Sequence, residues 1–152
     1  MENIKKAQSG AMLKVDNLKD REILHYNYTY TRNVDSKLKP TGEPAGGKIL
    51  LKVKALSDGN AELFAWLLNN LAKKNGKIEV MIPGESKKMK DIEFEDAYCV
   101  SYQEIWDIGL PSSKEGTISY PHQEHITLAC RKITNGATHE NEWDKEKESG
   151  EK

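Results

Sequence analysis

The chain lacks long hydrophobic runs and has few cysteines. Its 152 residues include two cysteines, and no apolar stretch approaches the roughly 20 residues that a membrane helix needs. Residues 1–10 have no apolar core of the kind found in a secretory signal, so we expect a flexible leader there. One disulfide between Cys99 and Cys130 would be feasible, but two buried free thiols in a reducing compartment are the interpretation that we favour.

The chain also lacks an excess of charge of either sign. Lys and Arg together number 23, and Asp and Glu together number 24. Such a balance creates no strong field toward nucleic acid or an anionic membrane, so we expect no nucleic-acid partner and no membrane insertion. The length suits one domain with its own core, over residues 11–143. We expect the mixed-charge tail at 144–152 to be disordered.

One segment, residues 57–76, has the periodicity of a helix. Its apolar residues recur at helical spacing and form one stripe, which consists of Leu63, Phe64, Leu67, Leu68 and Leu71. Trp66 lies off this stripe, and Asp58 and Asn60 are candidate caps. Gly76 can adopt the left-handed conformation that ends a helix. The apolar stripe needs a surface to pack on, and the rest of the chain offers only strands.

Alternating apolar and polar residues predict strands along most of the remaining chain. The predicted extended segments are 11–15, 23–32, 48–55, 77–82, 89–106, 117–120, 125–133 and 138–143. Asp96 interrupts the alternation of the longest segment, which indicates a bend or bulge near that residue. The sequence therefore predicts a mainly β protein, an antiparallel β-barrel or sandwich flanked by one α-helix.

Residues 33–47 form a long segment rich in glycine and proline. Two prolines and three glycines exclude a helix and a central strand there. A loop of about 15 residues inside a small domain is unusual and is often functional. Just before it, Tyr26, Tyr28 and Tyr30 share one face of a strand. That face is either part of the core, with the tyrosine hydroxyls reaching water at its edge, or a contact with another subunit.

Motifs that would carry catalysis or bind a metal are missing. His122 and His125 do not have the spacing of a metalloprotease helix, and in a strand they point to opposite faces. No third group is placed by the sequence to orient a Cys99–His pair, and strand cysteines usually belong to the core. We therefore expect a protein that is not an enzyme, with no catalytic residues, no metal site and no cofactor.

Several stretches, taken together and in order, resemble the Hcp (TssD) family, the tube protein of the type VI secretion system, and especially its Bacteroidetes branch. These stretches are residues 11–16 (AMLKVD), 24–35 (LHYNYTYTRNVD), 41–47 (TGEPAGG), 63–69 (LFAWLLN), 88–100 (KMKDIEFEDAYCV) and 139–143 (HENEW). The resemblance implies a β-barrel that assembles as homo-hexameric rings. The rings would stack into a tube inside a contractile sheath.

The resemblance also implies partners and a route. Sheath contraction would expel tube, spike and effectors, and the lumen can carry effector cargo. The subunit would be assembled in the bacterial cytoplasm and then secreted without a signal peptide. Two further interpretations remain: a small-molecule-binding β-barrel with the tyrosine row at its mouth, and a tube protein of a phage-tail-like contractile injection machine. A hydrolase that uses Cys99 or the histidines is a third, weaker alternative.

The predicted intersubunit contacts combine the glycine- and proline-rich arm with two flanking groups. Tyr30 and Arg32 place an aromatic ring beside an arginine, a composition common in interface anchors. Glu140 and Glu142 offer carboxylates that an arginine can bind. Trp143 is expected to dock on another subunit or on its own barrel. The full set is Tyr30, Arg32, Thr41, Gly42, Glu43, Pro44, Gly46, Gly47, Glu140, Glu142 and Trp143.

Overall fold

The computed structural model describes residues 10–108 and 120–143 of the chain. The predicted tail and nearly all of the predicted leader lie outside these ranges, as does most of the strand predicted at 117–120. Within the described residues the elements are β1 (Ala11–Val15), β2 (Arg21–Tyr28), β3 (Thr31–Val34), β4 (Pro40–Ala45), β5 (Lys48–Lys54), α2 (Glu62–Leu68), β6 (Lys74–Met81), β7 (Lys88–Trp106), β8 (His122–Asn135) and β9 (Ala137–Glu140).

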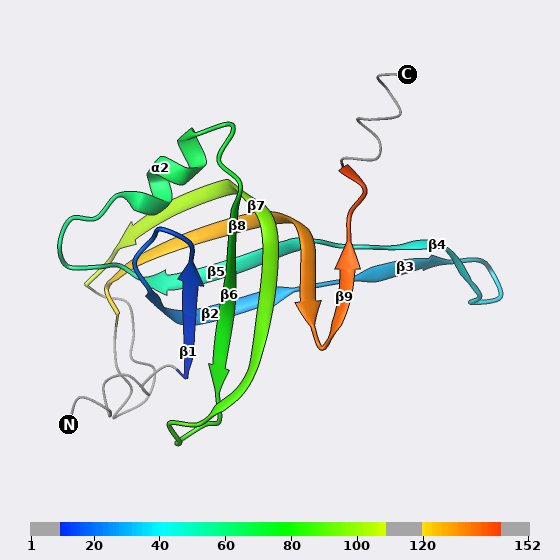
Figure 1. The fold of residues 1–152 in the computed structure, drawn as a ribbon, viewed down its shortest axis with the longest axis horizontal. Coiled ribbons are helices and arrows are strands. Elements are labelled where there is room, and N and C mark those ends of the chain that lie inside the picture. Colours follow the sequence, from blue (N-terminus) through cyan, green and yellow to red (C-terminus); the bar gives the residue numbers. More distant parts are fainter. Residues whose placement is uncertain (1–9, 109–119, 144–152) are drawn as a thin grey trace.

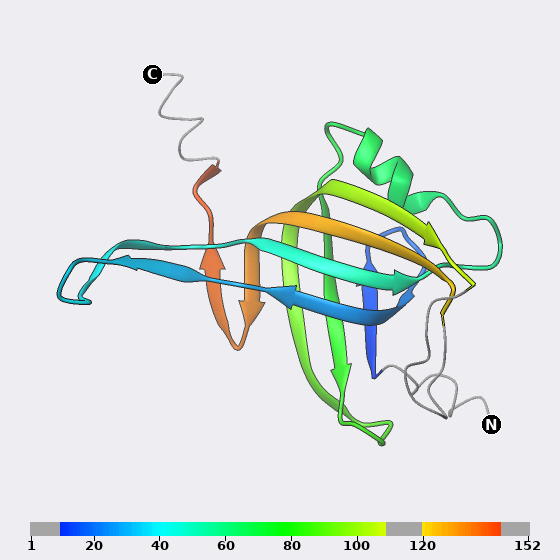
Figure 2. The same cartoon turned by 180° about the vertical axis from the view of Figure 1, so that it is seen from behind.

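Antiparallel strands close into a barrel (Figures 1 and 2). The strand order is β5-β2-β1-β6-β7-β8, and a further pairing of β5 with β8 joins the two ends. That closing pair is in register from Lys48 opposite Ala129 to Lys54 opposite Gln123. β9 is added to β8 outside the closed ring. The predicted fold class, a mainly β barrel with one helix, is confirmed.

Alternate side chains of the strands fill the barrel. In β5 the buried residues are Ile49, Leu51 and Val53, while the alternate residues, three lysines and Leu50, are exposed, as the period of two requires. Ile78, Ile92, Phe94, Ile126 and Leu128 come from the other strands and are likewise at most 2% exposed. Side chains therefore occupy the interior, as expected for a small barrel.

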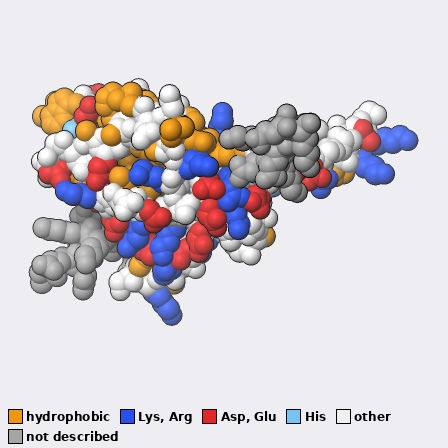
Figure 3. Space-filling model, turned by 45° about the horizontal axis from the view of Figure 1, so that its top comes forward, with side chains coloured by type: hydrophobic (Ala, Val, Ile, Leu, Met, Phe, Trp, Pro, Cys, Tyr) orange, Lys and Arg blue, Asp and Glu red, His pale blue; other side chains and the backbone are white. Residues whose placement is uncertain are grey.

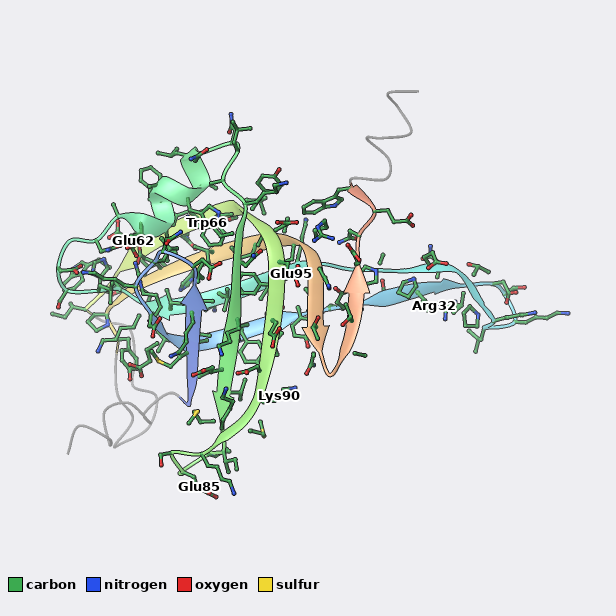
Figure 4. All side chains as sticks on the ribbon, in the orientation of Figure 1. Arg32, Glu62, Trp66, Glu85, Lys90 and Glu95 are labelled. Atoms are coloured by element: carbon green, nitrogen blue, oxygen red, sulfur yellow. The ribbon has the colours of Figure 1, made fainter. Side chains whose placement is uncertain are left out.

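The helix differs from its prediction in length and in the face that it buries. α2 ends at Leu68 because Asn69 is extended, and the Asn69 side chain accepts from the backbone of Leu71. Leu63 and Trp66 face the barrel, and the Trp66 indole donates to the Ala72 carbonyl at 3.0 Å. Figure 4 shows Trp66 beneath the helix. Of the predicted stripe, Leu68 and Leu71 are 63% and 85% exposed, so the prediction that the whole stripe packs on the strands was wrong. Trp66, which lies off that stripe, is buried instead.

Gly76 does not end the helix but lies inside β6. A Cβ atom there would be 2.5 Å from the carbonyl oxygen of Lys14 and 2.8 Å from the ring of Phe94. Glycine is therefore required because β1 and the core ring approach the backbone closely. The predicted caps, Asp58 and Asn60, do not occupy the N-cap, which is Ala61 and has no side-chain cap hydrogen bond. The Asn60 side-chain oxygen accepts instead from the backbone N–H of Glu62, the first residue of α2, at 2.8 Å.

The arm predicted at 33–47 is a paired hairpin rather than an irregular loop. β3 and β4 form their own two-stranded sheet, with Asn33 opposite Thr41 and Val34 opposite Pro40. Prolines fit here because neither strand has a neighbour on its outer side in the sheet topology of the described residues. Both figures show this hairpin extending beyond the barrel (Figures 1 and 2).

β7 contains the predicted irregularity. Asp96 has a φ of 51°, and the pairing with β6 shifts register between Lys74 and Gly76, opposite this point. The Asp96 backbone N–H donates to the side chain of Asn75 at 2.9 Å, which satisfies a donor that the ladder leaves free. The bulge prediction is confirmed. β8 begins at His122, three residues earlier than predicted.

Candidate subunit interface

The β3–β4 arm has no core of its own. All residues from Thr31 to Glu43 are exposed. A two-stranded hairpin alone is marginally stable in water, and its unpaired strand edges can pair with another chain. Figure 4 places Arg32 on this arm, outside the barrel. An exposed hairpin of this kind is suited to bind a surface of another molecule.

The tip of the arm is held by one aspartate. The Asp35 carboxylate accepts from the backbone N–H groups of Lys37 at 2.8 Å and of Lys39 at 3.0 Å. Backbone bonds between residues 35 and 39 close the same turn. Leu38 has a φ of 67° and is 78% exposed. The turn thus presents an apolar side chain between two lysines in a defined geometry.

The root of the arm packs on the C-terminal segment. The ring of Tyr30 lies against Gly46, where a Cβ atom would be 2.4 Å from the ring, and it makes an edge contact with His139 at 4.8 Å between centroids. Gly47 accepts from the backbone of Cys130 at 2.7 Å. Burial raises the pKa of the Tyr30 hydroxyl. The arm therefore leaves the barrel from a packed base.

Among the described residues, two buried polar atoms at this root have no hydrogen-bond partner. They are the hydroxyl of Tyr30 and Nδ1 of His139. Such atoms are uncommon in folded proteins, because leaving a buried polar group unpaired costs free energy. Both belong to residues in ring contact at the base of the arm.

The remaining predicted interface residues contact their own subunit. Arg32 donates to the Gly42 carbonyl within the arm at 3.1 Å. Arg131, which sequence reasoning missed, binds Glu140 and also donates to Asp96 at 2.6 Å. Trp143 lies against Tyr98 with ring centroids 5.8 Å apart, the alternative in which it docks on its own barrel. Thr41 and Glu43 are exposed in β4, Pro44 is half-buried there, and Glu142 is exposed.

A buried ion pair joins two barrel strands near the start of α2, and no local pattern of residues indicates it. Arg21 in β2 and Glu124 in β8 are 1% and 3% exposed, and their nearest atoms are 2.5 Å apart. Tyr102 donates to the other carboxylate oxygen, and Arg21 also donates to the side chain of Asn60, which bonds to the first residue of α2. Burial and the bond to Glu124 raise the pKa of Tyr102. The network joins two strands of the barrel to the start of the helix.

The cysteines and histidines that the sequence offered as candidate catalytic groups are buried or paired within the fold. Cys99 and Cys130 are buried and free, and burial raises their pKa values to about 11 and about 12, which disfavours the nucleophilic thiolate. His122 is close to Glu104, with 2.6 Å between the nitrogen and the carboxylate. Residues 10–108 and 120–143 contain no cluster of three side chains suited to hold a metal. None of their helices is long and apolar enough to span a membrane.

A family model described as hemolysin coregulated protein Hcp (TssD) matches residues 7–144. The chain belongs to the Hcp (TssD) family. This family consists of structural tube proteins and is not known as a family of enzymes. The resemblance stated from the sequence is thereby confirmed. Comparison with curated protein sequences gave no match.

Solved structures of Hcp proteins share the fold. Hcp1 from Flavobacterium johnsoniae is 28% identical, with a TM-score of 0.73 over 86% of this chain and 98% of that one. Hcp1 from the E. coli EAEC 042 pathovar is 12% identical, with a TM-score of 0.64 over 88% and 98%. A type VI secretion system effector from Yersinia pestis is also 12% identical, with a TM-score of 0.56 over 82% and 86%. The last two similarities concern the fold alone.

Proposed function

We propose that this chain is the repeating subunit of a type VI secretion tube, assembled as homo-hexameric rings that stack. Its Hcp family membership and the likeness to Hcp1 from Flavobacterium johnsoniae support the tube assignment. The observation that carries the assembly is the exposed β3–β4 arm, which buries little against its own barrel. A subunit that offers different surfaces at its two ends makes heterologous contacts, which close into rings around one axis and stay open along it.

The other partners follow from the same role. The outer wall of the tube would contact the sheath, one end of the tube would contact the spike, and the lumen would hold effector cargo. The subunit would assemble in the bacterial cytoplasm and leave with the expelled tube, without a signal peptide. The interior of each barrel is filled by side chains such as Phe94 and Leu128, so cargo would travel in the lumen of the ring and not within a subunit.

Light scattering on the purified chain at micromolar concentration tests the ring, with electron micrographs as a second readout. We expect a mass of six subunits and ring-shaped particles. A variant that replaces residues 32–44 by a short turn removes the arm and keeps its packed root. It should retain the circular dichroism of the barrel and lose stacking or ring formation. A monomeric wild-type chain would overturn the proposal, and an unfolded arm deletion would show that the arm belongs to the core.

A further inference from the structure

A cleft lies between α2 and the ends of β7 and β8. Its volume is about 320 Å³, and its lining includes Leu56, Phe64, Tyr102, Glu104, His122 and Glu124. The rings of Phe64 and Tyr102 are 5.2 Å apart between centroids and form an apolar wall. Phe64 is 44% exposed although it lies on a helix that packs against the barrel. The cleft therefore exposes aromatic surface to a potential partner.

The polar part of this cleft is acidic. Glu104 and Glu124 supply two carboxylates, and no lysine or arginine is among its described lining residues. Glu124 is buried and already bound by Arg21 and Tyr102, whereas the Glu104 side chain is 55% exposed beside His122. Glu104 is thus the carboxylate that a cation entering the cleft would meet. The cleft would favour an apolar group accompanied by positive charge.

The tip of the arm has the complementary composition. Leu38 is exposed between Lys37 and Lys39, and the Asp35 carboxylate holds the turn. Because the turn is already formed, little conformational entropy would be lost when it binds. Figure 3 shows blue side chains at the arm's end and a group of orange side chains at the opposite end, around α2.

We propose that the arm tip of one subunit docks in the α2 cleft of the next, with Leu38 against Phe64 and Tyr102 and a flanking lysine beside Glu104. The occupant is a second copy of this chain, so the inference rests on the proposed self-assembly and specifies one of its contacts. The arm tip and α2, whose Phe64 lines the cleft, lie at opposite ends of the long axis of the molecule (Figure 1). A contact between them is head-to-tail. Such contacts join many copies, either in a closed ring or in an open stack, instead of pairing two copies.

Charge favours this cleft over another cavity. A cavity of about 490 Å³ near the start of β1 is lined by apolar residues such as Leu24, Tyr26 and Met89, and none of its lining residues has a carboxylate. The apolar side chain of Leu38 by itself would fit either cavity. The two lysines beside Leu38 distinguish them, because complementary charge sets the register of a contact and disfavours the wrong partner.

Site-directed cross-linking tests the contact. Leu38→Cys is combined with Phe64→Cys and, as the matched control, with Met89→Cys, and assembled protein is treated with a short bismaleimide. The native thiols are buried and should react slowly. We expect a ladder of covalent multimers from the Leu38/Phe64 pair and none from the Leu38/Met89 pair. If the protein assembles but the Leu38/Phe64 pair does not cross-link, or only the Leu38/Met89 pair does, the proposed docking site is wrong. The proposal of a tube subunit would still stand. A chain that stays monomeric would overturn both.

Charge reversal provides an independent measurement. Lys37→Glu with Lys39→Glu should weaken assembly by about 10-fold or more, since like charges would then face each other across the contact. Adding Glu104→Lys to that variant should restore most of the loss. Glu85→Lys, at an exposed turn far from both surfaces, is the control and should restore nothing. Equal recovery by the two additions would contradict the proposed pairing.

Discussion

Asn141 and Gly46, 95 positions apart, are joined by a hydrogen bond of 3.3 Å from the side-chain amide of Asn141 to the carbonyl oxygen of Gly46. The same amide nitrogen donates to the Cys130 carbonyl at 3.0 Å. The ring of Tyr30 also packs against Gly46, so the root of the arm is held from two sides. The segment after β9 thereby fixes the point at which the arm leaves the barrel.

Asn141→Ala should loosen the arm without unfolding the barrel. The substitution leaves two carbonyl oxygens without this donor, and we expect a loss of about 1–3 kcal/mol in the free energy of unfolding. Amide hydrogen exchange in β3 and β4 should become faster. Asn27→Ala, which removes an exposed side-chain bond to His25, is the control and should change neither quantity measurably. Unchanged exchange in the arm of the Asn141 variant would show that the Tyr30 packing and the backbone bond between Cys130 and Gly47 hold the root without Asn141.

Trp66→Ala should be the most costly truncation in α2. The indole is 2% exposed and packs beneath the helix, so its loss should lower the free energy of unfolding by about 3–5 kcal/mol. Leu68→Ala, at a side chain 63% exposed, should change it by no more than about 0.5 kcal/mol. Urea denaturation measures both. A larger loss at Leu68 than at Trp66 would mean that the helix buries its other face.

Glu124→Gln should destabilise the subunit strongly. It leaves the guanidinium of Arg21 buried without its counter-charge, a change that typically costs about 3–5 kcal/mol. Glu104→Gln removes a carboxylate from a more exposed pair with His122 and should cost at most about 1 kcal/mol. Thermal unfolding at neutral pH compares the two variants. Similar melting temperatures of the two variants would indicate that the Arg21 guanidinium becomes hydrated, or moves to another partner, once Glu124 is neutral.

The free energy of unfolding should fall above pH 9, in part through Cys130. Burial raises the pKa of this thiol from 9.0 to about 12. Above pH 9 the unfolded chain therefore loses this proton before the folded chain does, and the free energy of unfolding decreases as the pH rises toward 12. By pH 11 this thiol should have lowered the free energy of unfolding by about 3 kcal/mol relative to pH 8.

A matched variant isolates that contribution from other titrating groups. Cys130→Ala removes the thiol, so its free energy of unfolding should decline less between pH 9 and pH 11 than that of the wild-type chain. Urea titrations across this range supply the comparison, with each protein referred to its own value at pH 8. Parallel declines in the two proteins would mean that Cys130 does not titrate differently in the folded and unfolded states.

The sequence by itself determined the local features of this protein. Alternation predicted strands such as β1 and β5, because successive side chains of an extended chain point to opposite sides whatever the fold. The break in alternation at Asp96 predicted the bulge, and prolines and glycines located the arm. These signals depend only on residues near one another in the chain. The family resemblance added the barrel, which periodicity alone could not distinguish from a sandwich.

The tertiary structure decided which distant residues meet. Closure of the barrel through β5 and β8 brought Arg21 to Glu124, a pair 103 positions apart that no local pattern indicates. The turn after Asn69 ended the helix early and left Leu71 exposed while Trp66 entered the core. Arg131 rather than Arg32 bound Glu140, because β8 and β9 are adjacent in the sheet whereas the arm leaves the barrel. Periodicity fixes the spacing of side chains along an element, but only the packing of elements fixes which face is buried and which charges are paired.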